Sequence, residues 1–140
     1  MTPRVVLDTN VVIAGVRSPS GAAAAILRRI ESKSFVVCLS PALMLEYEDV
    51  LRRPMWGLDA DVVEDLLNIF LVVSDLVVPK FKLRPNLRDP GDDHVLELAV
   101  AAGANRIITF NVRDFRGAER FGILIERPSD FLDRLTSHVD

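Results

Sequence analysis

The stretch Arg4-Val5-Val6-Leu7-Asp8-Thr9-Asn10 is the part of the sequence from which the fold is predicted most directly. Its apolar run, 5–7, is short and continuous, without the alternation of polar and apolar residues that marks a strand with one wet face. Such a strand is typical of a parallel sheet, which helices cover on both faces. The polar triplet Asp8-Thr9-Asn10 is interpreted as the end of this strand.

Strand and helix patterns alternate along the rest of the chain. Ser40-Pro41 is a strong helix start, with a serine cap and proline at the first position, and Gly103 is a typical left-handed helix end. The predicted strands are 4–7, 35–39, 76–78, 106–110 and 122–125, and the predicted helices are 22–31, one from 41, one from Asp59 or Asp61 to 73, 92–102 and 128–135. This alternation predicts an α/β fold with a parallel sheet and right-handed crossovers.

Length and composition limit the classes of protein to consider. The chain has 140 residues, which we interpret as one domain, 1–140, and its 49% hydrophobic and 26% charged residues are typical of a globular protein. No apolar run approaches the roughly 20 residues that span a bilayer, and the N-terminus lacks a signal-peptide pattern, so we expect a cytoplasmic protein without membrane contact. The net charge of −3 argues weakly against extended duplex binding but does not exclude a nuclease, because bound cations offset an acidic metal site.

Several acidic or amide side chains are predicted to gather at one edge of the sheet. In open α/β sheets, ligands bind at the carboxyl ends of the strands, near the point where the strand order reverses. The residues expected near this edge are Asp8 after the first strand, Glu46 on the helix after the second, Asp92 and Asp93 at the start of the helix before the fourth, and Asn111 and Asp114 after the fourth.

Each of these acids also has an ordinary structural interpretation, such as a loop cap, a solvated helix residue or a helix N-cap. Together they are harder to explain, because two carboxylates about 4 Å apart repel by roughly 4 kcal/mol at an effective dielectric constant of about 20. A bound cation compensates this repulsion, and oxygen ligands favour Mg²⁺ or Mn²⁺. The chain has only two histidines, His94 and His138, and one cysteine, Cys38, which argues against a zinc centre.

Four segments resemble the motifs of PIN domains, in the order that this family has them. The first is the hydrophobic strand closed by Asp8-Thr9-Asn10, within 5–13, and the others are 40–46, 89–99 and 107–115. The resemblance covers nearly the whole chain and implies a three-layer α/β/α sandwich with a central, mainly parallel sheet of about five strands. It further implies a divalent-metal-dependent endoribonuclease, with Mg²⁺ or Mn²⁺ as its cofactor and RNA as its substrate. Many short members are toxins of toxin–antitoxin pairs of the VapC type.

The resemblance implies that Asp8, Glu46 and Asp92 are catalytic, metal-binding carboxylates, with Asp93 as a competitor of Asp92. Many members have aspartate at the position of Asn111.

Asp114 supplies an acid three residues after Asn111, about one turn further on if the chain coils there. We therefore expect Asp114 to be the fourth charged ligand and Asn111 to orient a water.

Other polar residues near these positions are candidates for supporting roles. Thr9, Asn10 and Thr109 are expected to hydrogen-bond the carboxylates, although strand-end hydroxyls often serve only the backbone. Three arginines are expected on nearby loops, where they would contact RNA phosphates or simply be solvated: Arg17, Arg113 and Arg116.

The function expected from these observations is cleavage of RNA phosphodiester bonds by a toxin, with an antitoxin partner and a homodimer as further expectations. A nucleotide-binding module is disfavoured because neither G-x-G-x-x-G nor a P-loop follows the first strand. A phosphatase or receiver-like protein is disfavoured because no lysine follows the fourth or fifth strand. A catalytically inactive PIN-like domain, or another α/β domain that binds RNA or protein, remains the alternative.

Overall fold

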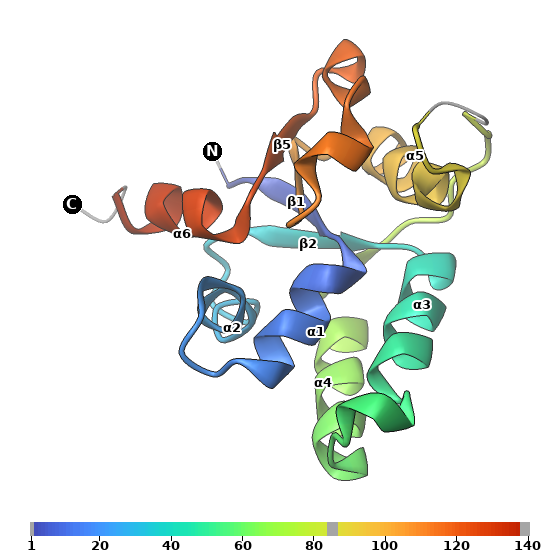
Figure 1. Cartoon of the computed structure of the whole chain (residues 1–140). Coiled ribbons are helices and arrows are strands. Elements are labelled where there is room, and N and C mark those ends of the chain that lie inside the picture. The colour runs from blue at the N-terminus through green and yellow to red at the C-terminus, as the bar shows by residue number, and fades with distance from the viewer. Residues whose placement is uncertain (1, 84–86, 138–140) are drawn as a thin grey trace.

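The computed structural model describes residues 2–83 and 87–137, and in this part of the chain five parallel strands form one sheet (Figure 1). The strands lie in the order β3-β2-β1-β4-β5, and β1 pairs with β4 so that Val6 lies opposite Ile107. Their bounds are β1 Arg4–Leu7, β2 Val36–Leu39, β3 Asp75–Leu76, β4 Arg106–Ile108 and β5 Leu124–Glu126. The predicted α/β fold with a central parallel sheet is therefore confirmed, and all the strand pairs described are parallel.

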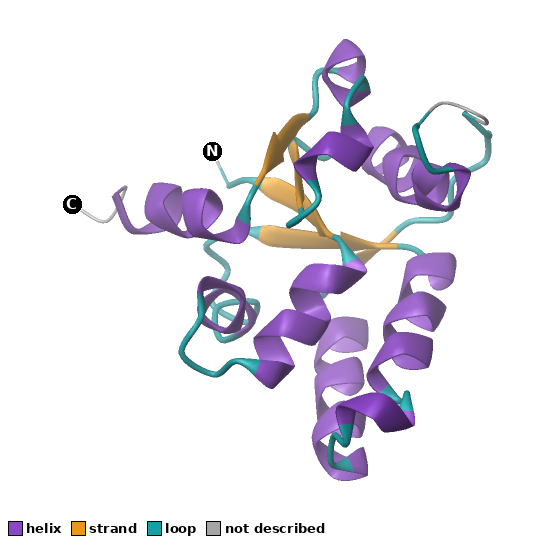
Figure 2. Cartoon of the chain, in the orientation of Figure 1, coloured by secondary structure: helices purple, strands orange, loops and turns teal. Residues whose placement is uncertain are grey.

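Helices cover both faces of the sheet, as the predicted three-layer arrangement requires (Figure 2). Helices α1 to α4 lie on one side and α5 lies on the other, while α6 packs against α2 (Figure 1). The helices are α1 Thr9–Arg17, α2 Ala22–Leu27, α3 Pro41–Leu51, α4 Ala60–Val73, α5 Asp93–Ala102 and α6 Pro128–Ser137, and short 3₁₀ helices span Pro54–Trp56, Pro90–Asp92, Val112–Phe115 and Ala118–Phe121. In the described part of the chain, no helix combines the length and the apolar character needed to cross a bilayer.

The direction in which successive strands are added to the sheet reverses between β1 and β4. The chain runs from β1 outward to β2 and β3, and it then returns to the other side of β1 for β4 and β5. Residues that follow β1 and β4 consequently emerge side by side at the carboxyl edge, which is where open α/β sheets bind their ligands.

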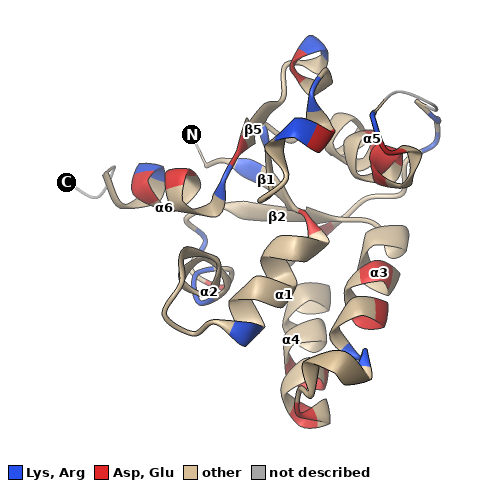
Figure 3. Cartoon of the chain, in the orientation of Figure 1, with Lys and Arg blue, Asp and Glu red and all other residues tan. Residues whose placement is uncertain are grey.

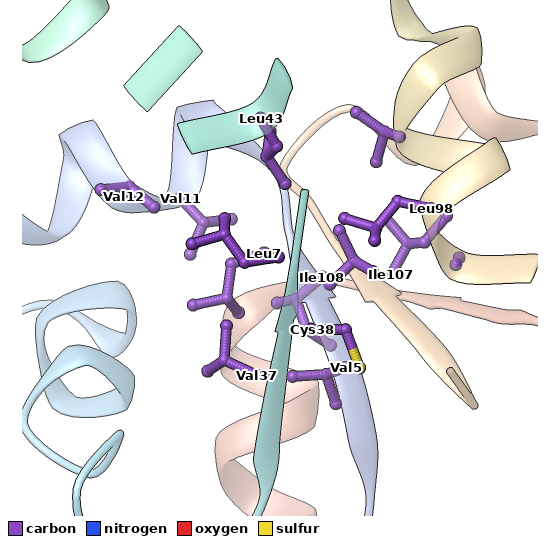
Figure 4. Packing of buried hydrophobic residues seen from close by; sticks show 14 of the residues in the cluster. Val5, Leu7, Val11, Val12, Val37, Cys38, Leu43, Leu98, Ile107 and Ile108 are labelled. Atoms are coloured by element: carbon purple, nitrogen blue, oxygen red, sulfur yellow. The ribbon is translucent and has the colours of Figure 1, made fainter. Parts of the chain in front are cut away.

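The core fills the space between the sheet and its two helix layers. Val5, Leu7 and Ile107 on the strands are fully buried, and Leu43 of α3 and Leu98 of α5 pack on them (Figure 4). Each such side chain contributes about 1.5–3 kcal/mol when it is removed from water. The packing fixes the strand ends, and thereby the positions of the polar residues that follow them.

Helix α1 was not predicted from the sequence. The stretch Thr9-Asn10-Val11-Val12-Ile13 consists of residues with modest helix propensity, and Asp8 was interpreted as the end of a strand and as a metal ligand, not as a helix N-cap. In the structure Asp8 is the N-cap of α1, and burial of Val11 and Val12 outweighs the weak local preference.

The predicted helix caps are present, whereas several element ends differ by a few residues. Ser40 Oγ accepts a hydrogen bond from Leu43 N at 3.1 Å, Asp59 caps α4, and Gly103 has a φ of 65° at the end of α5. Helix α2 ends at Leu27, four residues early, because the chain continues in turns. Strand β4 ends at Ile108, so Thr109 follows the strand.

The smaller differences concern the outer strands and one loop. Strand β3 begins one residue earlier than predicted and β5 two residues later. The predicted surface loop 80–91 ends in the 3₁₀ helix Pro90–Asp92, and its residues 84–86 lie outside the described residues.

Candidate metal centre at the carboxyl edge

Asp8 stands at the end of β1 with both carboxylate oxygens engaged. Its backbone N–H donates to the carbonyl of Ile108 at 2.9 Å, which continues the β1–β4 ladder by one residue. Oδ1 accepts from Thr9 N at 2.9 Å and Oδ2 accepts from Thr109 Oγ1 at 2.8 Å. The residue is only 7% exposed. Burial raises the pKa of Asp8, and the hydrogen bonds from Thr109 and Thr9 oppose that rise.

Thr109 connects the ends of β1 and β4. It is fully buried, and besides its bond to Asp8 its hydroxyl accepts from Asn111 N at 3.0 Å and from Asn10 Nδ2 at 3.3 Å. Asn10 Oδ1 in turn accepts from Phe110 N at 3.4 Å. The polar residues that follow the two strands therefore form one network around the Asp8 carboxylate.

Glu46 reaches the same edge from α3. The neighbouring Tyr47 is fully buried and its hydroxyl donates to the carbonyl of Leu7, so this turn of α3 is fastened to the end of β1. Thr9 Oγ1 donates to Glu46 Oε2, and His94 Nε2 lies 3.1 Å from Glu46 Oε1. The hydrogen bond from His94 lowers the pKa of Glu46, with a further contribution from Thr9, while burial opposes both.

Asp92 and Asp93 are adjacent in sequence but differ in their surroundings. Asp93 is fully buried, and its Oδ1 accepts from Leu87 N at 2.8 Å, so this carboxylate holds the loop before α5. Asp92 is half-buried at the N-cap of α5, yet its side chain makes no capping hydrogen bond. The Asp92 side chain therefore does not cap the helix, and its carboxylate is close enough to Asp8, Asp114 and Glu46 to be affected by their charges.

Asn111 and Asp114 follow β4 in a 3₁₀ turn. Asp114 N donates to the carbonyl of Asn111 at 3.0 Å within Val112–Phe115, which is the coil expected after the strand. Asp114 is half-buried and Asn111 is exposed.

The charge of Asp114 contributes to the raised pKa of Asp92, which indicates that the two carboxylates share one electrostatic environment.

The acids at this edge repel one another. The pKa of Asp92 is raised from 3.8 to about 7, first by burial and then, in decreasing order of effect, by the charges of Asp8, Asp89, Asp114 and Glu46. Figure 3 shows acidic positions directly after β1, along α3 and on α5. Four segments that are distant in sequence thus contribute negative charge to one place.

These side chains do not form a closed metal cage. Within residues 2–83 and 87–137, no group of three or more His, Cys, Asp and Glu side chains is arranged so that it could hold an ion by itself. The oxygen-only donor set nevertheless suits Mg²⁺ or Mn²⁺, because Mg²⁺ keeps several waters and is commonly bound through one or two carboxylates together with substrate phosphates.

The three arginines predicted near the site lie in different places. The Arg17 guanidinium lies 4.2 Å from the centre of the Trp56 ring, at the opposite end of α1 from Asp8. Arg113 and Arg116 are exposed on and beside the 3₁₀ turn after β4. His138 lies outside the described residues.

His94 is the contact residue that the sequence-based prediction missed. It was considered only as evidence against zinc, yet its ring adjoins Glu46 and its Nδ1 is buried without a hydrogen-bond partner in the described part of the chain. Its place two residues after Asp92, on the helix that enters β4, was the available signal.

Comparison with known proteins agrees with this architecture. A sequence model of the PIN domain family matches residues 4–113. A chain in the crystal structure of VapBC2 from Rickettsia felis bound to a DNA fragment from their promoter is similar in fold, with a TM-score of 0.58 and 15% sequence identity over 89% of this chain and 98% of that one. No curated protein matches the sequence. Because the family model covers most of the chain, the protein belongs to the PIN domain family.

Proposed function

We propose that this protein is a divalent-metal-dependent endoribonuclease. The observation that carries the proposal is that acids from four separate segments, Asp8, Glu46, Asp92 and Asp114, meet at the carboxyl edge, where burial and the charges of its neighbours raise the pKa of Asp92 to about 7. Repulsion among these carboxylates destabilises the folded protein, and a divalent cation bound between them would offset it by attracting each carboxylate. Membership of a family typical of nucleases supports the same conclusion.

Asp8, Glu46 and Asp92 are the residues proposed to hold Mg²⁺ or Mn²⁺, with Asp114 as the fourth acid. When bound, the ion supplies an electrophile for the scissile phosphate and lowers the pKa of a water that attacks in line. The protein contributes placement, because the Thr109 hydroxyl holds Asp8 and the Thr9 hydroxyl holds Glu46.

Asn111 stands exposed at the N-terminal end of the 3₁₀ turn that carries Asp114. Its amide is suited to orient a water at the site. Asp93 is excluded from the proposed set because its carboxylate binds the backbone of Leu87.

The substrate proposed is single-stranded RNA. The net charge of −3 disfavours the broad backbone contact that duplex binding needs. A single strand needs only a local path across the carboxyl edge, where the cation neutralises the acids near the phosphate.

The test is cleavage of a fluorogenic single-stranded RNA by the purified protein with Mg²⁺ or Mn²⁺, with EDTA, and with the variants Asp8→Asn and Glu46→Gln. Asp133→Asn, an exposed acid on α6, is the matched control. We expect cleavage by wild type and the control, and none with EDTA or in the two site variants. Full cleavage after chelation would exclude the mechanism, whereas RNA binding without any cleavage would favour the inactive RNA-binding alternative.

We further propose that the protein is the toxin of a toxin–antitoxin pair, since the similar fold comes from a VapBC2 complex. Growth arrest on expression, relieved by co-expression of a neighbouring small reading frame whose product co-purifies, would support this. Unimpaired growth with no co-purifying protein would contradict it.

A homodimer is also proposed, because Val62, Leu71 and Val72 of α4 are apolar and exposed. Light scattering after size-exclusion chromatography tests it, and a monomeric mass at all concentrations would refute it.

A further inference from the structure

A hollow of about 440 Å³ opens beside the carboxylates, between the start of α3 and the chain that follows β3. Its walls include Pro41 and Ala42 of α3, and His94 forms part of the boundary towards α5. Because His94 Nε2 lies 3.1 Å from Glu46 Oε1, the hollow and the candidate metal centre share a wall. Its volume is within the range of pockets that bind small organic groups.

The segment Lys80-Phe81-Lys82 gives this hollow an unusual lining. The chain bends at Phe81, and all three side chains line the hollow. The sequence contains only three lysines, so two of them stand here, and Lys33 is the third.

Neither Lys80 nor Lys82 forms an ion pair within the part of the chain that the structure describes. Phe81 is 40% exposed and lines the hollow, so part of its ring is accessible there.

We propose that this hollow binds one nucleotide of the RNA strand next to the scissile phosphate, with the base on Phe81 and the flanking phosphates on Lys80 and Lys82. The inference rests on the proposed nuclease function and names the place where the substrate leaves the metal centre.

The chemistry of the lining matches a single-stranded nucleotide. The ammonium group of lysine is a point charge on a flexible side chain, and it binds phosphate. Lys80 and Lys82 flank Phe81, so each can reach a phosphate on one side of the nucleotide. A phenylalanine ring accepts any base by stacking, so it contributes affinity without strong sequence preference. The rest of the wall is mixed: Val78 and Pro79 are apolar and lie beside Phe81, whereas Ser40, His94 and Glu97 are polar. The Glu97 carboxylate accepts from Leu83 N at 2.8 Å, and the apolar part of the wall suits the face of a base.

The two lysines of the hollow also bear on the negative charge of the candidate metal centre, which repels RNA phosphates. A strand that crosses the edge meets the acids Asp92 and Asp114, so cations elsewhere along its path, such as Lys80 and Lys82, would attract its other phosphates.

The experiment measures binding of a short fluorescein-labelled single-stranded RNA by fluorescence anisotropy in EDTA. EDTA prevents cleavage and metal-dependent binding, so the measurement is independent of the metal centre. Each protein is also tested with a strand of the same length that has the ribose–phosphate backbone without bases. The variants are Phe81→Ala, Phe81→Leu, which keeps apolar bulk, and the double variant Lys80→Ala/Lys82→Ala.

Two matched controls lie elsewhere on the chain. Phe121→Ala removes a ring that is 39% exposed on the 3₁₀ helix Ala118–Phe121, and Lys33→Ala removes the remaining lysine. Neither residue lines the hollow.

We expect wild type to prefer the strand with bases, and both Phe81 variants to lose about tenfold in affinity together with most of that preference. The double lysine variant should keep the preference, while the slope of log K against log salt should become shallower by about 1.4, as two phosphate contacts on a single strand predict. Both controls should bind as wild type does.

The proposal is overturned if the Phe81 and lysine variants bind like wild type, or if wild type does not bind RNA at all. It fails separately from the nuclease proposal: cleavage by wild type with unaltered binding by these variants refutes only the nucleotide site. Lost binding in the variants of a protein that never cleaves RNA refutes only the nuclease.

Discussion

Replacing Asp92 by asparagine tests whether its carboxylate charge destabilises the folded protein when no metal is bound, through burial and through repulsion by the neighbouring acids. The change removes one negative charge and keeps the shape of the side chain. Because Asp92 makes no capping hydrogen bond, the variant loses no such bond, unlike a change at Asp8, which accepts from Thr9 and Thr109. The effect on stability should therefore report electrostatics.

The magnitude follows from the pKa of Asp92. The difference between about 7 and the usual 3.8 corresponds to an upper limit of about 4 kcal/mol. Since Asp92 is only half-buried, solvent screening reduces this to about 1–2 kcal/mol. Loss of a favourable charge at the N-terminus of α5 costs about 0.5 kcal/mol. We expect a net gain of about 1 kcal/mol, which raises the Tm by about 3–4 °C.

The same reasoning predicts a pH dependence in metal-free buffer. A raised pKa means that the folded protein binds the proton of Asp92 more tightly than the unfolded chain does. This contribution to stability is complete below the usual pKa of 3.8 and is lost as the pH rises through about 7. Thermal unfolding followed by circular dichroism in EDTA, at about pH 5 and about pH 8, should show the gain of Asp92→Asn mainly at the higher pH.

Asp133→Asn on α6 is the control, and as an exposed change it should alter the free energy of unfolding by less than about 0.5 kcal/mol. A Tm of Asp92→Asn equal to or below that of wild type at the higher pH would refute the reasoning, because the ionised Asp92 carboxylate would then not destabilise the folded protein.

Three further predictions concern the surroundings of the site. Thr109→Val should destabilise the protein by about 1–3 kcal/mol in chemical denaturation, since it removes the hydroxyl between Asp8 and Asn111 N; equal stability would contradict this. Gly15→Ala should cost about 1–3 kcal/mol in the same assay, because the added Cβ would lie 2.4 Å from Leu27 Cδ1. Unchanged stability would contradict this and would show that the Leu27 side chain moves aside. In a Mg²⁺ titration of cleavage, Asp114→Ala should need more metal than Asn111→Ala, and the reverse order would reassign the fourth ligand.

The order of elements was predictable because it depends on local patterns that the tertiary structure reinforces. The continuous apolar strands and the Ser40 and Gly103 caps are strong signals that agree with the final packing. Helix α1 was missed for the opposite reason: its β-branched residues favour a helix only after Val11 and Val12 are buried against the sheet. Strand ends shifted by one or two residues because buried side chains such as Phe35 and Thr109 lie just beyond the paired residues, so hydrophobicity and burial do not show where the ladder stops.

The candidate site was predictable in its residue types and less so in its contacts. The rule for strand ends placed Asp8 and Asp114 at one edge, but no sequence pattern distinguished Asp92 from Asp93. That distinction depends on the loop before α5, whose Leu87 N–H occupies the Asp93 carboxylate. The contact of His94 with Glu46 likewise depends on how α3 and α5 meet across the sheet.

Direct binding of Mn²⁺, measured by the loss of its free electron paramagnetic resonance signal during titration, tests the central claim most directly. We predict saturable binding to wild type at one or two sites for each chain, and its loss when Asp8, Glu46 and Asp92 are replaced together by the corresponding amides. The Asp133→Asn control should bind like wild type. Equal Mn²⁺ binding by the triple variant and wild type, or no saturable binding by wild type, would contradict the account.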